Sequence, residues 1–156
     1  MHMRDQDERH FKVTLRHDGG YRFVSQAHED GRVHGDSYPS DEPDPVGEAS
    51  GPSTPALLGS ALGHCLSAAL LEALRKARVE VKGVETEVDA IVRLGDEGLP
   101  RIARVEVRLR PELSAVEGRA QRCADIFEKH CTVTASVKRG IDVRVHVDWH
   151  VPAPAA

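Results

Sequence analysis

Apolar and polar positions alternate near the start of the chain, with the period of a half-buried β-strand. The alternation runs from Phe11 to Leu15 and is followed by a turn at residues 17–20, after which residues 21–24 begin a second strand. We therefore expect a β-hairpin over residues 11–26.

The alternation is lost over residues 27–54, where four prolines stand among Asp, Glu, Ser and Gly. Val33 and His34 could form a short edge strand, but we expect most of this stretch to be loop. Loops of this length within a compact domain are usually functional or disordered.

A helical period begins after Ser53-Thr54-Pro55, which offers a hydroxyl cap and a proline in the first turn. The helix closes at Arg75-Lys76, whose positive charges suit its negative end. Small residues crowd its first half, so we expect a central, tightly packed helix. Its two apolar rows are Leu62, Leu66, Leu70 and Leu74, and Leu57, Leu58, Ala61, Cys65, Ala68 and Ala69.

Strand patterns return in the second half of the chain. Residues 84–94 and 102–110 predict a second hairpin, and we expect Pro111 to end it. Val105, Val107 and Leu109 should face inward, with charged residues between them.

The C-terminal part predicts one further helix and more strand. Residues 114–130 have helical period, and residues 133–149 predict two strands about Gly140. This order of elements predicts an α+β fold with helices packed on antiparallel sheets. The apolar face of the helix consists of Val116, Ala120, Cys123, Ala124 and Phe127.

The length of 156 residues suits one domain with its own core. We expect a flexible N-terminus at residues 1–10, a single domain over residues 11–149 and a tail at residues 150–156. The net charge is −4, with acids and bases interspersed, so no basic patch indicates nucleic-acid binding. No apolar run approaches the ~20 residues that span a bilayer, and the polar N-terminus carries no secretory signal.

Three cysteines, Cys65, Cys123 and Cys131, are an odd number for an exported disulfide scaffold, so we expect a cytoplasmic protein. Cys123 and Cys131 are eight residues apart on one expected helix, or about 12 Å. That is too far for a disulfide, which leaves Cys65 as the plausible partner of Cys131. Cys123 is most simply a buried apolar residue, and Cys65 alone could be either structural or reactive.

Two stretches resemble the OsmC/Ohr family of osmotically induced and organic-hydroperoxide-resistance proteins. Leu57-Leu-Gly-Ser-Ala-Leu-Gly-His-Cys65 is similar to the helix that carries the first family cysteine. Ala124-Asp-Ile-Phe-Glu-Lys-His-Cys131-Thr-Val-Thr-Ala-Ser-Val137 is similar to the passage that carries the second. The resemblance covers nearly the whole chain and implies an intertwined α+β homodimer in which antiparallel sheets surround two central Cys-bearing helices.

The resemblance also implies a thiol peroxidase that acts on organic hydroperoxides and needs no cofactor. Cys65 would attack the peroxide and become a sulfenic acid, and Cys131 would resolve it to a disulfide. A dithiol such as a lipoyl protein would then reduce that bond. We place Cys131 at the negative end of its helix, where a thiolate is disfavoured, which suits the resolving role.

The family also uses an arginine and a glutamate. Arg22 best matches the arginine from the N-terminal hairpin, although it could be an exposed strand residue. The glutamate position holds Pro55-Ala56, so Glu48 in the preceding loop is the candidate substitute, while Glu72 lies about 10 Å beyond Cys65 along the helix.

Two other readings remain open. The pairs His64-Cys65 and His130-Cys131 could bind zinc, but neighbouring residues on a helix point about 100° apart, and no CxxC or HxxxH spacing is present. We expect His64 alone to be a packed or interface residue, and its proximity to the sulfur keeps a general base as the alternative. The other reading is a non-catalytic dimeric protein that binds a small molecule in the apolar pocket of the same fold.

Overall fold

The N-terminal third of the chain forms a four-stranded antiparallel sheet. β1 (Phe11–His17) pairs with β2 (Phe23–Glu29), and β3 (Arg32–Val33) and β4 (Tyr38–Ser40) both pair with β2. Gly19 and Gly20 form the tight turn with φ angles of 86° and 51°, which only glycine adopts readily. The predicted hairpin is confirmed, and the stretch after it contains more strand than expected.

α1 (Thr54–Lys76) begins and ends where the sequence predicts. The Ser53 carbonyl accepts the Leu57 N–H at 3.0 Å, which closes the first turn. One apolar row supplies most of the buried core: Leu62, Leu66, Leu70 and Leu74, each 6% exposed or less. The opposite side of the helix, including Ala61, His64, Ala68 and Leu71, is exposed.

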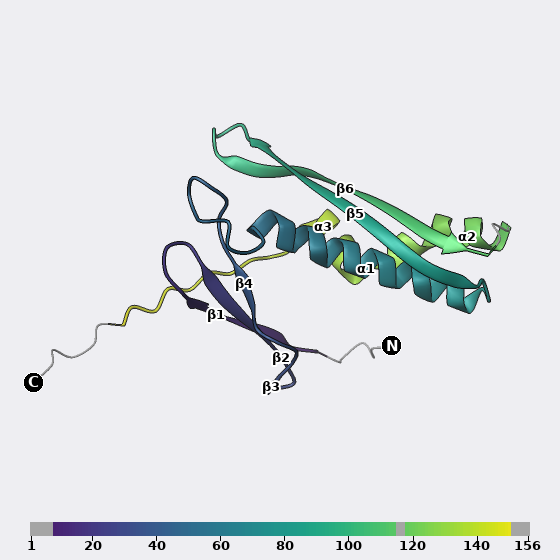
Figure 1. Ribbon diagram of the computed structural model, residues 1–156, viewed down its shortest axis with the longest axis horizontal. Coiled ribbons are helices and arrows are strands. Elements are labelled where there is room, and N and C mark those ends of the chain that lie inside the picture. Colours follow the sequence, from purple (N-terminus) through teal and green to yellow (C-terminus); the bar gives the residue numbers. More distant parts are fainter. Residues whose placement is uncertain (1–7, 115–117, 151–156) are drawn as a thin grey trace, which may run out of the picture. The chain divides into compact units, whose positions relative to one another are not determined.

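β5 (Val81–Leu94) and β6 (Pro100–Leu113) form a separate two-stranded sheet, visible as a long twisted ribbon (Figure 1). A Cβ atom added at Gly63 would lie 2.8 Å from Val88 Cγ2, so the small residue permits close approach of β5 to the first half of α1. The expectation that Pro111 ends β6 is wrong. β6 continues past Pro111 to Leu113. Each strand of a two-stranded sheet has one unpaired edge, where the missing N–H of a proline removes no hydrogen bond between strands.

The region after β6 departs most from the prediction. Instead of one helix over 114–130, α2 (Gly118–Ile126) is followed by a 3₁₀ turn, η1 (Phe127–His130), and a break at Cys131. Ala120 and Cys123 are buried as predicted, but Ala124 is exposed. Val116 lies outside the described residues. Cys123 and Cys131 therefore do not share a helix, and the separation of about 12 Å calculated from the helical rise does not apply to them.

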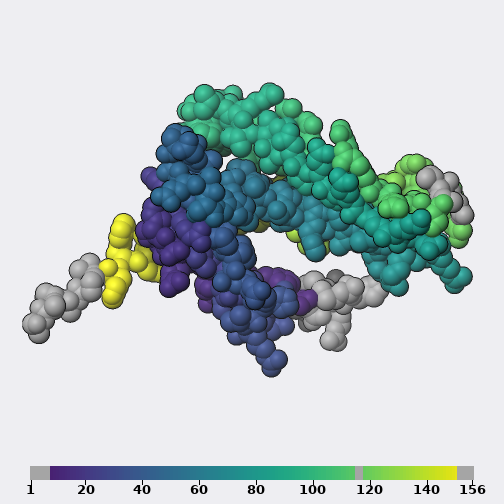
Figure 2. Space-filling view, in the orientation of Figure 1, coloured from purple at the N-terminus to yellow at the C-terminus, as the bar shows by residue number. Residues whose placement is uncertain are grey.

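The predicted strands at 133–149 are also wrong. Residues 132–139 form α3 (Thr132–Arg139), which ends at Gly140 with a φ of 78°. Residues 140–150 have no regular structure and are drawn as a thin yellow ribbon in Figure 1, and part of the segment is visible in yellow in Figure 2. Their apolar side chains are exposed, Val145 by 79% and Trp149 by 90%.

The computed structural model describes residues 8–114 and 118–150. The chain divides into two compact units, Met1–His64 with Val84–Pro111 and Cys65–Gly83 with Glu112–Ala156. The mixture of helices and antiparallel sheets confirms the predicted α+β class. The single-domain boundary stays a prediction.

By length and composition alone α1 is long and apolar enough to cross a membrane, and the core helix of a soluble protein passes the same test.

We expect Leu74→Ala to lower the free energy of unfolding by about 3 kcal/mol, because Leu74 is 1% exposed and the change leaves a cavity. Leu71→Ala, three residues earlier on the same helix and 40% exposed, is the matched control and should cost much less. Urea unfolding of both variants tests this. Equal losses would show that Leu74 is not the core position assigned here.

Candidate functional site

Two cysteine side chains meet in the second compact unit. Cys65 lies on α1 and Cys131 immediately precedes α3, and each thiol shifts the pKa of the other. Both are free thiols. Cys65 is partly exposed, whereas Cys131 is fully buried at 0% exposure. The structure thus brings together the two cysteines that the sequence paired, and only one of them is open to solvent.

Cys131 is the N-cap of α3. Its Sγ accepts the Thr134 N–H at 3.4 Å and donates to Thr134 Oγ1 at 3.1 Å. Cys131 is also the C-cap of η1, as the expected negative helix end requires, but the sequence analysis missed the helix that begins after it. Because the chain breaks before Cys131 and a new helix starts after it, the sulfur lies at a positive helix end, where a thiolate is favoured.

The surroundings shift the two thiol pKa values in opposite directions. Burial and the hydrogen bond with Cys131 raise the pKa of Cys65. Burial also acts to raise the pKa of Cys131, but the hydrogen bonds from Cys65, from the Thr134 side chain and from the backbone of Thr134 and Val133 lower it overall. Within the pair, negative charge is therefore favoured on Cys131.

Cys123 is separate from this pair. It is 5% exposed, and its Sγ donates a hydrogen bond to the Ala73 carbonyl of α1 at 3.4 Å. This position fits the predicted role of a buried packing residue.

Arg22 belongs to the first compact unit, directly after the β1–β2 turn. Its Nε pairs with Asp18 Oδ2 at 3.0 Å, and its Nη1 donates to the Ser50 carbonyl and hydroxyl at 3.1 and 3.0 Å. The Ser50 hydroxyl in turn donates to the buried Asp41 carboxylate at 2.8 Å. Arg22 is thus fixed to the loop before α1, and its action on Cys65 stays a prediction.

Asp41 organises that loop. Its carboxylate also accepts the backbone N–H groups of Glu42, Glu48 and Ser50 at 2.8, 3.3 and 3.1 Å. Hydrogen bonds led by the Ser50 side chain lower the pKa of Asp41. The side chain of Glu48 itself is exposed, so the loop holds the backbone of Glu48 and leaves its carboxylate open to solvent.

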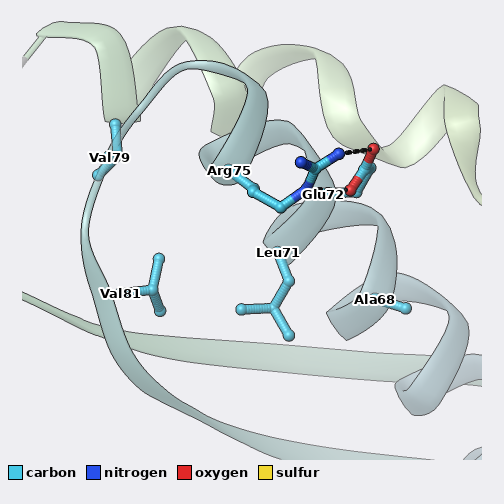
Figure 3. A pocket seen from close by; sticks show the side chains of 6 residues that line it. All are labelled: Ala68, Leu71, Glu72, Arg75, Val79 and Val81. Carbon is cyan, nitrogen blue, oxygen red and sulfur yellow. Dashed lines mark hydrogen bonds and ion pairs between the residues drawn. The ribbon is translucent and has the colours of Figure 1, made fainter.

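Glu72 is engaged on the far half of α1. Arg75 donates two hydrogen bonds to the Glu72 carboxylate, at 2.8 and 2.9 Å, and Lys76 Nζ lies 3.3 Å from Glu72 Oε1. Hydrogen bonds from Arg75 and Lys76 lower the pKa of Glu72 to about 2. Figure 3 shows this pair on the edge of a surface groove of about 460 Å³ lined by Ala68, Leu71, Glu72, Arg75, Val79 and Val81. Neither Cys65 nor Cys131 lines the groove.

The two His-Cys sequences do not make a metal cluster in the part of the chain that the structure describes. No group of three or more His, Cys, Asp and Glu side chains is placed there to hold a metal ion. His64 is exposed on α1, and His130 is exposed at the end of η1.

Thr134 is the main residue of this site that the sequence analysis missed. The alternation and β-branched residues of Thr132-Val-Thr134 favoured a strand, and a strand would not direct an N–H at Cys131. The spacing Cys-x-x-Thr before a Gly stop is the signal that could have indicated a short capped helix.

Solved structures of low sequence identity share this fold. An OsmC-like protein of unknown function from Vibrio cholerae has a TM-score of 0.65 at 14% identity, covering 83% of this chain and 93% of its own. An organic hydroperoxide resistance protein from Elizabethkingia anophelis has a TM-score of 0.63 at 14% identity, covering 86% and 91%. An OsmC organic hydroperoxide resistance protein from Legionella pneumophila has a TM-score of 0.59 at 13% identity, covering 86% and 92%.

Among curated proteins, none matches the chain. The family model described as OsmC-like protein matches residues 47–146, which include α1, the β5–β6 hairpin and both paired cysteines. The chain therefore belongs to the OsmC-like protein family, as the sequence resemblance indicated.

Proposed function

We propose that this protein is a thiol-dependent peroxidase that reduces organic hydroperoxides through Cys65 and Cys131. The observation that carries the proposal is a pair of interacting thiols, one partly exposed and one buried. Membership of the OsmC-like family and the hydroperoxide-resistance names of structural neighbours support it.

Cys65 is the attacking sulfur in this proposal because a peroxide can reach it, while Cys131 is fully buried. The ionised form of Cys131 accepts the Cys65 proton, and the Cys65 sulfur attacks one peroxide oxygen. The O–O bond breaks, the alkoxide takes a proton from solvent and leaves as an alcohol, and Cys65 becomes a sulfenic acid.

Cys131 then completes the oxidation. Its sulfur attacks Cys65 Sγ, the S–OH bond breaks, and the departing hydroxide takes the Cys131 proton to form water. The pair has passed two electrons and its one proton to the peroxide, and solvent has supplied the second proton, which forms the alcohol. A dithiol reductant, of which a lipoyl protein is an example, returns them and completes the cycle.

Arg22 remains the predicted cation that favours the thiolate and binds the peroxide, and Glu48 remains the predicted acid beside it. Asp18 and Ser50 hold Arg22 in the described structure, which supports a fixed rather than a free guanidinium. We also retain the prediction of a cytoplasmic protein.

A homodimer is part of the proposal. Residues 141–149 alternate apolar and polar positions, yet their apolar side chains are exposed, as are Phe11, Val13 and Leu15 on β1. A segment in which apolar and polar residues alternate, and whose backbone N–H and C=O groups form no strand pairing, can pair with a strand of another chain. A second copy of the same chain would supply the partner strand and cover these faces.

The proposal is tested by the consumption of cumene hydroperoxide with dithiothreitol as reductant. We expect catalytic turnover, with slower consumption of hydrogen peroxide. The second candidate, a non-catalytic binding protein, is favoured by the groove along α1 and by the raised pKa of Cys65. That candidate predicts no consumption above the reductant alone.

A further inference from the structure

The two sulfurs of the cysteine pair differ in access. Cys131 has no exposed surface, and residues of α3 contact its sulfur. Cys65 is partly exposed. Once the two are joined in a disulfide, an incoming thiol must reach one sulfur, and in the described structure Cys65 is the accessible one.

The two sulfurs also differ as leaving groups. Thr134 provides a backbone N–H to Cys131 Sγ at 3.4 Å and a hydroxyl in contact at 3.1 Å. A hydroxyl can rotate to donate its proton once the sulfur is ionised. In thiol–disulfide exchange, the thiol that is more stable as a thiolate leaves faster.

We propose that the reductant attacks Cys65, that Cys131 leaves as the thiolate, and that Thr134 is the positioning residue that makes Cys131 the leaving group. The inference rests on the proposed function, since it concerns the disulfide formed in that cycle. It assigns the direction of reduction and a role to a residue outside the two cysteines.

The electrons and protons balance as follows. A thiolate of the reductant attacks Cys65 Sγ, the Cys65–Cys131 bond breaks, and its electron pair goes to Cys131. Cys65 now carries a mixed disulfide. The second thiol of the reductant gives up its proton and attacks its own mixed-disulfide sulfur, which releases Cys65 as a thiolate and leaves the reductant as a cyclic disulfide.

A trapping experiment tests the direction. The disulfide is prepared in two samples of the full-length protein, one oxidised with cumene hydroperoxide and one with diamide, which needs no peroxidase activity. Each sample receives N-acetylcysteine, a monothiol that can form the mixed disulfide but has no second thiol to release it. Acid then quenches the reaction while the mixed disulfide is still present. Free thiols are then alkylated with N-ethylmaleimide, and the modified peptides are identified by mass spectrometry.

We expect N-acetylcysteine on Cys65 and N-ethylmaleimide on Cys131. The reverse pattern overturns the inference. A disulfide that forms with diamide but not with the hydroperoxide contradicts the proposed function while leaving the direction of reduction testable. Failure of both oxidants to link the two cysteines contradicts the inference and the proposed function together.

Thr134→Val tests the positioning role, because it keeps the size of the side chain and removes the hydroxyl. We expect reduction of the disulfide by dithiothreitol to slow by about three- to tenfold. Thr134→Ser should restore the rate. Thr132→Val is the matched control, because Thr132 is exposed in the same first turn of α3, and it should behave as the parent protein.

A second readout separates this role from simple packing. In the Cys65→Ser, Cys123→Ser background only Cys131 can ionise as a thiol, and thiolate absorbance near 240 nm follows its titration. Thr134→Val should raise that pKa, and Thr134→Ser should leave it near the parent value. An unchanged pKa and reduction rate in Thr134→Val would overturn the assignment of Thr134.

Discussion

Replacing Cys65 by serine should abolish consumption of cumene hydroperoxide, a loss of at least about a thousandfold in rate. Serine is close to cysteine in size, so the helix is retained, but its hydroxyl is a far weaker nucleophile. Cys65 is only partly buried, which limits any effect of the substitution on packing. The measurement is peroxide consumption with dithiothreitol in excess, together with circular dichroism to confirm that the variant is folded.

The other two cysteines supply the controls. Cys131→Ser should react only once, and more slowly because the proton acceptor for Cys65 is lost, leaving a sulfenic acid on Cys65 that a dimedone probe labels. Cys123→Ser should keep full activity and lose only about 1 kcal/mol of stability, since its hydroxyl can still donate to the Ala73 carbonyl. Turnover by Cys65→Ser equal to that of Cys123→Ser would show that Cys65 is a packing residue.

The second large effect concerns the segment at residues 141–149. Val145 is 79% exposed in the single chain, and substitution of such a residue usually changes stability by no more than about 0.5 kcal/mol. If a second copy covers this side chain, Val145→Asp buries a charge at an interface and should cost several kcal/mol. We therefore expect the variant to lose the dimer in analytical ultracentrifugation at micromolar concentration.

His146→Asp is the matched control, because successive residues of a strand point to opposite faces. It introduces the same side chain on the polar face of the segment and should leave the dimer intact. A folded monomer of the parent protein, or equal behaviour of the two variants, would contradict the proposed dimer.

The sequence predicted the elements whose periodicity is long and consistent. Within the 23 residues of α1, a leucine recurs at every fourth position from Leu62 to Leu74. The β1–β2 hairpin combines alternation of apolar and polar residues with a Gly-Gly turn. Short elements were predicted less well. α3 has eight residues, and its Thr-Val-Thr start has the alternation of a strand, so the cap by Cys131 and the stop at Gly140 decide its structure.

The same error affected the electrostatics of the site. The sequence analysis paired Cys65 with Cys131, and the structure places both in the same compact unit, while their disulfide stays a prediction. It missed α3, whose first turn directs the Thr134 N–H at the sulfur, so it gave Cys131 only the environment of a helix C-terminal end. The contacts of Arg22 with Asp18 and Ser50 join residues up to 28 positions apart, which periodicity does not report.

In the proposed cycle, Cys131 therefore has a further role. A resolving thiol that is itself stabilised as a thiolate is both a proton acceptor for Cys65 and a good leaving group when the disulfide is reduced. Both properties depend on the first turn of α3 and on Thr134. In the proposed cycle, peroxide reduction and the regeneration of the two thiols therefore both depend on the short helix α3.

The central claim is that peroxide oxidises Cys65 and Cys131 to a disulfide with each other. The direct measurement is mass spectrometry of the protein after one equivalent of cumene hydroperoxide, intact and after non-reducing digestion. We predict a chain about 2 Da lighter, with Cys65 and Cys131 in one linked peptide pair and Cys123 free. An unchanged mass, or a disulfide that includes Cys123 in place of either partner, would contradict the account.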